Sequence, residues 1–330
     1  MSQSVLVTGG AGYIGSHACK ALAQAGYVPV TYDNLSRGHR HAVRWGPLVE
    51  GEIADHAAVA AALKAHHVSS VMHFAAFAYV GESGTDPALY YRNNVVGTLA
   101  LLDAMREAAV DRIVFSSTCA TYGLPEKMPI AETTPQRPVN PYGETKLAIE
   151  RVLHWYGQAY GLRSVALRYF NASGCDRDGE IGEEHDPETH LIPLVLRAAL
   201  GSAGPVSIFG TDYATQDGTA IRDYIHVEDL ASAHVRAIRY LAEGGASTAV
   251  NLATGRGYSV REIIAAVARA AGRDVPQREA PRRPGDPPAL VADASLARSV
   301  LGWQAECSDL DNIIRTALAW EMRRHNDPAR

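Results

Sequence analysis

The stretch that most constrains this chain is a glycine-rich segment near its N-terminus, Thr8–Gly15. It follows a short apolar run, Val5–Val7, of the kind that a buried parallel strand needs. A helical pattern follows it. The glycines Gly9, Gly12 and Gly15 fall three residues apart. Because they lack a Cβ, they permit a tight turn, close approach of the backbone to a pyrophosphate, and tight packing of helix on strand.

A second apolar run, Val28–Tyr32, ends in Asp33, 18 residues beyond Gly15. A carboxylate in this place holds a ribose 2′-hydroxyl and repels a 2′-phosphate. A bare glycine pattern is also compatible with a turn that binds nothing. The order of the elements, strand, loop, helix, strand and acid, favours a dinucleotide site. The helix N-terminus would face the phosphates, and the acid favours NAD over NADP.

The composition excludes several other classes of protein. Hydrophobic residues make up 47% and charged residues 20% of the 330 residues, and the net charge of −5 gives no reason to expect a nucleic acid or an anionic membrane as partner. No apolar run reaches spanning length and no signal peptide precedes the first strand. The four cysteines are scattered without zinc spacing, which predicts free thiols and a cytoplasmic location.

Strand and helix patterns alternate through the first half, which predicts an α/β fold of the Rossmann type with a doubly wound parallel sheet. After the first two strands, further strands are expected at 48–53, 70–74, 112–117 and 164–169, and helices at 56–66, 87–108 and 142–160. Ligands of such sheets bind at the carboxyl ends of the strands, where small residues cluster in this sequence.

Beyond Asn171 the pattern becomes irregular, with an acidic segment at 176–188 and short helices and strands after it. We therefore expect a Rossmann NAD-binding domain over 1–172 and a smaller mixed α/β substrate lobe over 173–330. Segments at about 218–260 are expected to return to the first domain. The proline-rich run 281–288 is expected to be a loop.

Tyr142 and Lys146 lie four residues apart on a predicted helix and therefore share a face. A nearby ammonium group is expected to lower the pKa of the Tyr142 phenol and make it a proton acceptor. The strand that ends at Ser116–Thr118 brings hydroxyl groups to the same region. Phenol, ammonium, the Thr118 hydroxyl and a nicotinamide together form a site that oxidises an alcohol.

Several blocks of sequence resemble the extended short-chain dehydrogenase/reductases, and within them the enzymes that epimerise nucleotide sugars. The resemblance covers nearly the whole chain. It is carried by Thr8–His17, Asp33-Asn34, Val80–Ser83, Tyr91–Asn94, Pro141–Lys146, Leu167–Asn171, Asp217–Val227 and Arg283–Asp286.

The resemblance implies two sets of binding residues. NAD is expected to contact Gly9, Gly12, Tyr13, Ile14, Gly15, Asp33, Asn34, Glu52, Ile53, Phe74, Ala75, Ala76, Asn93, Ser116, Tyr142, Lys146 and Tyr169. A UDP-sugar is expected to contact Thr118, Tyr142, Asn171, His190, Leu191, Phe209, Arg222, Arg283, Asp286 and Leu290. Arg222 and Arg283 suit a diphosphate because guanidinium groups bind phosphate oxygens in pairs.

The resemblance also implies the reaction, an isomerisation. Tyr142 would take the proton of the sugar 4-hydroxyl, with Lys146 and Thr118 as the other catalytic residues. UDP-glucose and UDP-galactose would be interconverted through a 4-keto sugar, with NAD regenerated in each cycle. A homodimer is expected, formed by the helices at 87–108 and 142–160.

Five positions depart from the commonest pattern of the family. Thr118 stands in place of a serine, Glu52 of an aspartate, Ala78 of a lysine and His190 of an asparagine. Leu290 stands where many members have a tyrosine. Its smaller side chain leaves room for an N-acetyl group, so activity on UDP-GlcNAc and UDP-GalNAc is a further hypothesis.

Three alternatives share much of this pattern. A UDP-pentose 4-epimerase would share almost every motif. A nucleotide-sugar 4,6-dehydratase is disfavoured because Cys119 and Ala120, instead of an acidic pair, follow Thr118. An NAD-binding regulator without activity is disfavoured because Tyr142 and Lys146 are both intact.

No metal site is expected. The segment at 176–188 is interpreted as a solvated acidic loop. The histidine pairs His39/His41 and His185/His190 lack a converging third ligand in the sequence, so they are interpreted as surface or core residues.

Overall fold

The computed structural model describes residues 3–283 and 285–326. Within them, seven strands form one sheet in which every neighbouring pair is parallel, in the order β10-β6-β5-β4-β1-β2-β3. The strands are β1 (Ser4–Thr8), β2 (Val28–Asp33), β3 (Leu48–Glu50), β4 (Val68–His73), β5 (Arg112–Ser116), β6 (Arg163–Arg168) and β10 (Thr248–Asn251). The predicted α/β doubly wound fold is confirmed.

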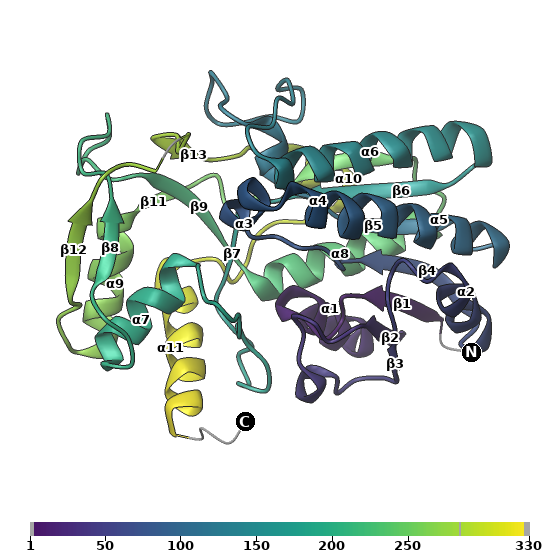
Figure 1. The fold of residues 1–330 in the computed structure, drawn as a ribbon, viewed down its shortest axis with the longest axis horizontal. Helices are drawn as coiled ribbons and strands as arrows, with labels where there is room; N and C mark the ends of the chain where they lie inside the picture. Colours follow the sequence, from purple (N-terminus) through teal and green to yellow (C-terminus); the bar gives the residue numbers. More distant parts are fainter. Residues whose placement is uncertain (1–2, 284, 327–330) are drawn as a thin grey trace.

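Apolar residues on both faces of the strands explain why helices cover both sides of this sheet. Val5 and Val7 of β1 pack into one core and Leu6 into the other, because successive side chains of a strand point to opposite faces. The first face is covered by α1 (Tyr13–Gln24), α8 (Val227–Ala242) and α10 (Ser295–Leu301). The second is covered by α2 (His56–Ala65), α5 (Gly97–Glu107) and α6 (Pro141–Tyr160) (Figure 1).

The predicted helix at 87–108 is interrupted in the structure. It consists of α4 (Pro87–Tyr90), a π-helical turn η2 (Tyr91–Val96) and α5. In this turn Asn94 is buried, and its side-chain oxygen accepts from the Phe77 backbone N–H at 2.9 Å while its amide donates to the Phe77 carbonyl at 3.1 Å. The wider turn thus holds the loop after β4, a tertiary contact that helical periodicity does not reveal.

The smaller lobe lies at the left in Figure 1 and has its own core. It contains α7 (Leu191–Leu200), α9 (Val260–Ala271), α11 (Leu310–Asn326) and the parallel pair β8 (Val206–Phe209) and β12 (Gln277–Ala280). A second, four-stranded sheet is formed by β7 (Asn171–Ser173), β9 (Ile221–His226), β11 (Gly257–Ser259) and β13 (Ala289–Leu290), with β9 pairing with the other three.

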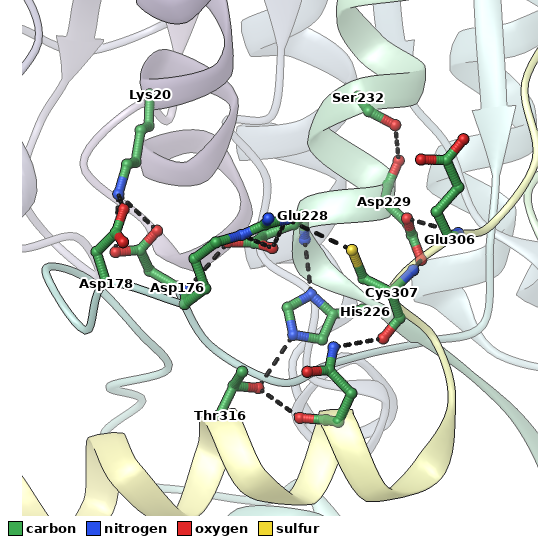
Figure 2. A network of polar contacts seen from close by, with 12 residues as sticks. Lys20, Asp176, Asp178, His226, Glu228, Asp229, Ser232, Glu306, Cys307 and Thr316 are labelled. Atoms are coloured by element: carbon green, nitrogen blue, oxygen red, sulfur yellow. Dashed lines mark hydrogen bonds and ion pairs between the residues drawn. The ribbon is translucent and has the colours of Figure 1, made fainter.

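Polar groups at the junction of the two lobes form the network in Figure 2. Lys20 of α1 donates to Asp176 at 2.8 Å and to Asp178 at 2.7 Å. His226 accepts from the backbone N–H of Glu228 at the start of α8, and its other ring nitrogen lies 3.0 Å from the hydroxyl of Thr316 on α11. The prediction that the acidic segment is a solvated loop is therefore wrong for Asp176. This residue is buried, and Lys20 of the large domain neutralises its charge.

The domain division at 172/173 stays a prediction. The segment at 218–260 is divided between the two parts of the molecule. Helix α8 packs on the large sheet and β10 is one of its strands, whereas β9 and β11 belong to the second sheet. The sequence did not indicate that α10 would also return to the large domain. Among the described residues, no helix combines the length and the apolar character that a membrane span needs.

Candidate active site

The glycine loop joins β1 to α1 at the carboxyl edge of the large sheet. Gly9 has φ +72°, and a Cβ there would lie 2.6 Å from the Ala75 backbone nitrogen. A Cβ on Gly15 would lie 2.2 Å from the Gly9 carbonyl oxygen. Gly12 is the N-cap of α1, and in the described structure no side chain caps this end. Its first-turn N–H groups can therefore bind an anion, which fits the pyrophosphate of a dinucleotide.

Asp33 stands at the end of β2, beside this loop. Its carboxylate accepts from the backbone N–H of Ala11 at 3.0 Å and of Leu35 at 2.8 Å. Burial raises the pKa of Asp33, and these two hydrogen bonds oppose that rise. The loop is thus tied to the acid that would bind the adenosine ribose. The neighbouring Asn34 donates to Glu52 at 3.0 Å, so Glu52 lies at the same edge.

Other residues predicted to contact NAD gather around the ends of β1, β4 and β5. The backbone N–H groups of Phe74 and Ala75 both donate to the Thr8 carbonyl, at 2.9 and 3.0 Å, which brings Phe74–Ala76 next to the glycine loop. Ile53 packs against Gly97, where a Cβ would lie 2.6 Å from its Cγ2 atom. Asn93 lies on the π-helical turn, and its amide donates to Asn94. The residues present therefore fit a dinucleotide.

The start of α6 carries the reactive pair. Asn140 is the N-cap, accepting from the Gly143 backbone N–H at 2.8 Å, and Pro141 occupies the first helical position. This fixes the direction of the helix so that Lys146, which is buried, donates to the Ser116 carbonyl at 2.8 Å. The Lys146 Nζ atom lies 5.9 Å from the centroid of the Tyr142 ring.

Burial shifts the pKa of both members of this pair. Burial raises the pKa of Tyr142 to about 12, and a hydrogen bond with Thr118 opposes the rise. Burial lowers the pKa of Lys146 to about 7, although Glu150 favours the charged form. In this structure the pKa of Tyr142 is therefore raised, not lowered as expected, because loss of solvation is the largest influence on it. Loss of solvation also favours the neutral form of Lys146.

Thr118 and Tyr169 complete the polar side of the site. Thr118 is the N-cap of the short turn η3 (Cys119–Tyr122), and its hydroxyl accepts from the Ala120 N–H at 3.1 Å. The Thr118 hydroxyl lies near the phenol, since it opposes the rise in the pKa of Tyr142, and it also donates to the Tyr169 carbonyl at 3.5 Å. The hydroxyls of Ser116 and Tyr169 are hydrogen-bonded at 2.5 Å.

Glu150 is a residue of this region that the sequence analysis missed. It lies one turn beyond Lys146 and accepts from Ser117 at 2.5 Å. Arg168 donates to both of its carboxylate oxygens, at 2.9 and 2.5 Å. Its spacing of four residues from Lys146 was the signal that could have identified it. Glu150 thereby positions the end of β5 behind the reactive pair.

The residues predicted to hold the diphosphate of a UDP-sugar converge at the edge of the second sheet. Arg222 of β9 pairs with Asp286, and the guanidinium of Arg283 lies 3.6 Å from the other oxygen of Asp286. The ring of Phe209 lies 4.9 Å from the Arg283 guanidinium. Asp286, predicted to contact the UDP-sugar, is thus paired with both arginines.

The predicted sugar-contacting residues are distributed more widely. Leu290 of β13 is in register with Arg222 and packs against the small core cluster formed by Cys119, Tyr122, Ile130, Ala253 and Ala292. Asn171 donates from its side chain to the Asp223 carbonyl at 3.2 Å, and Leu191 is the first residue of α7.

His190 is held by acids of its own segment. Its Nδ1 atom lies 2.7 Å from Glu183 and 3.2 Å from Glu188. These carboxylates raise the pKa of His190 to about 10, although loss of solvation opposes the rise. The inference that the histidine pairs lack converging ligands is wrong, because the fold brings two glutamates to His185 and His190 and one, Glu184, to His39 and His41.

Known proteins are similar to this chain over most of its length. Residues 5–253 match the family described as NAD dependent epimerase/dehydratase. The UDP-glucose 4-epimerase of Rhizobium leguminosarum bv. trifolii is 53% identical over 321 residues, which cover 97% of this chain and 98% of that protein.

Solved structures agree with this similarity. The UDP-glucose 4-epimerase of Brucella ovis, solved in complex with NAD, superposes with a TM-score of 0.95 at 58% identity and covers 96% of this chain and 98% of that one. The UDP-glucose 4-epimerase of Stenotrophomonas maltophila, solved with NAD and formylated UDP-arabinopyranose, has a TM-score of 0.95 at 41% identity, with 98% and 99% covered.

Proposed function

The chain belongs to the NAD dependent epimerase/dehydratase family, and from that premise we propose that it interconverts UDP-glucose and UDP-galactose by inverting C4. The observation that carries this conclusion is the set of Tyr142, Thr118 and Lys146 beside the glycine loop, in a chain that matches UDP-glucose 4-epimerases from end to end. The enzyme is thus an isomerase that uses NAD.

In the proposed mechanism Tyr142 is the proton acceptor for the sugar 4-hydroxyl. The Thr118 hydroxyl, which lies near the phenol, would orient the same sugar oxygen. Lys146, held by the Ser116 carbonyl, supplies a donor at the inner side of the site. The glycine loop and Asp33 would hold NAD, which would supply a hydride acceptor that is regenerated in each cycle.

Arg222 and Arg283 are proposed to bind the diphosphate. Both guanidinium groups already face one carboxylate, Asp286, which occupies the place of an anion between them. A diphosphate carries more negative charge than this carboxylate and accepts paired hydrogen bonds from arginine. When it binds, Asp286 is released to accept from a ribose hydroxyl.

A second candidate is UDP-pentose 4-epimerisation. The Stenotrophomonas maltophila relative holds formylated UDP-arabinopyranose, a nucleotide sugar with a pentose ring. Activity on UDP-GlcNAc and UDP-GalNAc stays a proposal that rests on Leu290, which is in register with Arg222 and packs against the core cluster that contains Cys119.

The test is incubation of the purified protein, without added NAD, with UDP-glucose, UDP-GlcNAc and UDP-xylose in separate reactions, followed by chromatographic separation of the 4-epimers. Conversion of UDP-glucose is expected. Reaction of the pentose alone would make the second candidate the function. Failure of all three substrates, even after NAD is supplied, would overturn the proposal and favour an NAD-binding regulator.

We infer that the protein forms a homodimer through η2, α5 and α6. Large apolar side chains on these neighbouring helices are exposed in the single chain: Trp155 is 68%, Tyr160 54% and Val96 54% exposed. In water such a group of apolar side chains favours burial against a second copy. Light scattering should give twice the 35.4 kDa mass, and Trp155→Glu should return the monomer mass. The predicted cytoplasmic location stays a prediction.

A further inference from the structure

Two histidines and two glutamates converge on one point in the segment that leads into α7. The Nδ1 atom of His185 lies 3.2 Å from Oε1 of Glu183 and 3.8 Å from Oε1 of Glu188. The Nδ1 atom of His190 lies 2.7 and 3.2 Å from the same two oxygens. One donor atom from each residue lies within 4.8 Å of every other. The reaction proposed above uses none of Glu183, His185 and Glu188.

These separations match the edges of a tetrahedral coordination sphere. Zinc binds histidine nitrogen and carboxylate oxygen at roughly 2.0–2.2 Å, so ligands at the corners of a tetrahedron stand about 3.3–3.5 Å apart. The four nitrogen-to-oxygen separations span 2.7–3.8 Å, on both sides of that value. Imidazole and carboxylate donors in this number suit a zinc-type ion better than calcium or magnesium, which prefer oxygen alone.

Burial gives an independent reason to expect a ligand here. The side chains of Glu183 and Glu188 are 5% and 2% exposed. The Oε1 atom of Glu188 faces the two histidines; its other oxygen, Oε2, is buried, has no hydrogen-bond partner among residues 3–283 and 285–326, and lies 3.7 Å from the guanidinium of Arg197. Buried carboxylate oxygens normally have a partner, because an unsatisfied one loses its solvation without compensation.

The charge of the site and its access to solvent also suit a divalent cation. Two carboxylates and two imidazolium groups sum to zero charge. Two carboxylates, two neutral imidazoles and one divalent ion also sum to zero, so the ion can replace two protons without adding net charge. The ring of His190 is 47% exposed, which leaves an entry from solvent. Backbone N–H groups of Thr189 and His190 donate to Glu188 Oε1 and hold this carboxylate in place.

We propose that Glu183, His185, Glu188 and His190 form a binding site for one zinc-type divalent cation. The bound ion would tie the segment before α7 to the cofactor loop, because the His185 ring packs edge-on against Tyr13 and Tyr79, with ring centroids 6.0 Å apart in both pairs.

Two other clusters in the described structure are poorer candidates. Lys20 already neutralises Asp176, Asp178 and Glu180 at 2.7–2.9 Å, so its ammonium fills that position. The cluster of His39, His41 and Glu184 offers three donors, and Glu184 is also paired with Arg324 at 3.1 Å. These clusters provide internal controls for the test.

The experiment uses full-length, tag-free protein treated with a chelator and then titrated with Zn²⁺ in competition with a chromogenic chelator. One ion per chain is expected. Titration with Co²⁺ should give the intense visible absorption of a tetrahedral site. Glu188→Gln and His185→Gln should each weaken the affinity by about a hundredfold or more, since loss of an outer-sphere partner alone costs about 10–100-fold.

His39→Gln is the matched control, because it removes one imidazole from the neighbouring cluster and should leave the affinity unchanged. Circular dichroism establishes that each variant is folded. His185 is partly exposed, so His185→Gln is expected to fold even if Glu188→Gln does not. Wild-type protein that binds no Zn²⁺, or binding that is lost in His39→Gln and kept in His185→Gln, would overturn the proposal.

Discussion

At the scale of single residues, the unusual property of the site is a half-buried phenol close to a buried amine. The pKa of Tyr142 is raised to about 12 and that of Lys146 is lowered to about 7, both mainly by loss of solvation. Tyr142 is therefore neutral near pH 7, and Lys146 is about half protonated. A positive charge brought close to Tyr142 would favour its phenolate, so its basicity depends on what occupies the site.

Replacing Tyr142 by Phe removes the proton acceptor and leaves the ring. We expect turnover of UDP-glucose to fall by about 10²–10⁴-fold, the usual contribution of general-base catalysis, with NAD still bound. Initial rates and the NAD content of the purified variant measure the two effects. A variant that keeps near-normal turnover would remove Tyr142 from the mechanism.

Leu290→Tyr tests whether this position selects the sugar. A larger side chain at this position, which is in register with Arg222, should exclude an N-acetyl group, so kcat/KM for UDP-GlcNAc should fall by about 10–200-fold, the range for steric selection by one small group. UDP-glucose should be converted within a few-fold of the original rate. Leu290→Met serves as the volume-matched control. Equal losses for both sugars would show that Leu290 affects the site without selecting for the N-acetyl group.

At the scale of elements, two helix starts organise the site. The glycine loop places the uncapped N-terminus of α1 at the edge of the sheet, and the Asn140 cap with Pro141 places the start of α6. Both follow from local sequence, because a capping residue, a proline and closely spaced glycines define a helix start without distant contacts.

Gly15→Ala tests the close packing of the α1 start on the loop. Its Cβ would lie 2.2 Å from the Gly9 carbonyl oxygen, and neither backbone segment can yield cheaply. We expect the free energy of unfolding to fall by about 1–3 kcal/mol, as for other overpacked sites, and NAD affinity to fall with it. Thermal melting with and without NAD measures both. In Gly204→Ala, where a Cβ meets nothing within 4 Å, neither quantity should change.

At the scale of the whole molecule, several histidines are buried in the neutral form, and one of them, His226, lies at the junction with the smaller lobe. Burial lowers the pKa of His73 to about 3, and Lys146 adds to this. His73 lies between the hydroxyls of Thr8 and Thr98, at 2.7 and 2.8 Å. His17, His226 and His234 share the lowered pKa, each about 4 and each mainly because of burial.

These histidines predict a loss of stability in mild acid. Their pKa values are lower in the folded than in the unfolded chain, so the unfolded chain binds more protons between about pH 6.5 and pH 4. The free energy of unfolding should thus be highest above pH 6.5. It should fall below that by up to about 1.4 kcal/mol per pH unit for each histidine.

Denaturant unfolding at a series of pH values measures this slope. His73→Gln should make the slope between pH 6.5 and pH 4 shallower, and His154→Gln, at an exposed position on α6, should not. An unchanged slope in His73→Gln would show that His73 is protonated equally in the folded and unfolded chains.

Much of the fold and of the NAD site was predictable because its signals are local. Strands β1 and β2 are short apolar runs, and the glycine loop and Asp33 follow them at fixed spacing. The face shared by Tyr142 and Lys146 follows from helical periodicity alone. These features depend on residues that are close along the chain.

Only the tertiary structure decided which distant residues meet and how burial changes them. The pairing of Lys20 with Asp176 and the approach of Glu183 to His190 depend on how segments pack in three dimensions. The opposite pKa shift of Tyr142 arises because burial is a property of the packed molecule. The sequence by itself determined the chemical groups and their local order, and the packing determined their solvation and their partners, on which the chemistry of a titratable group depends.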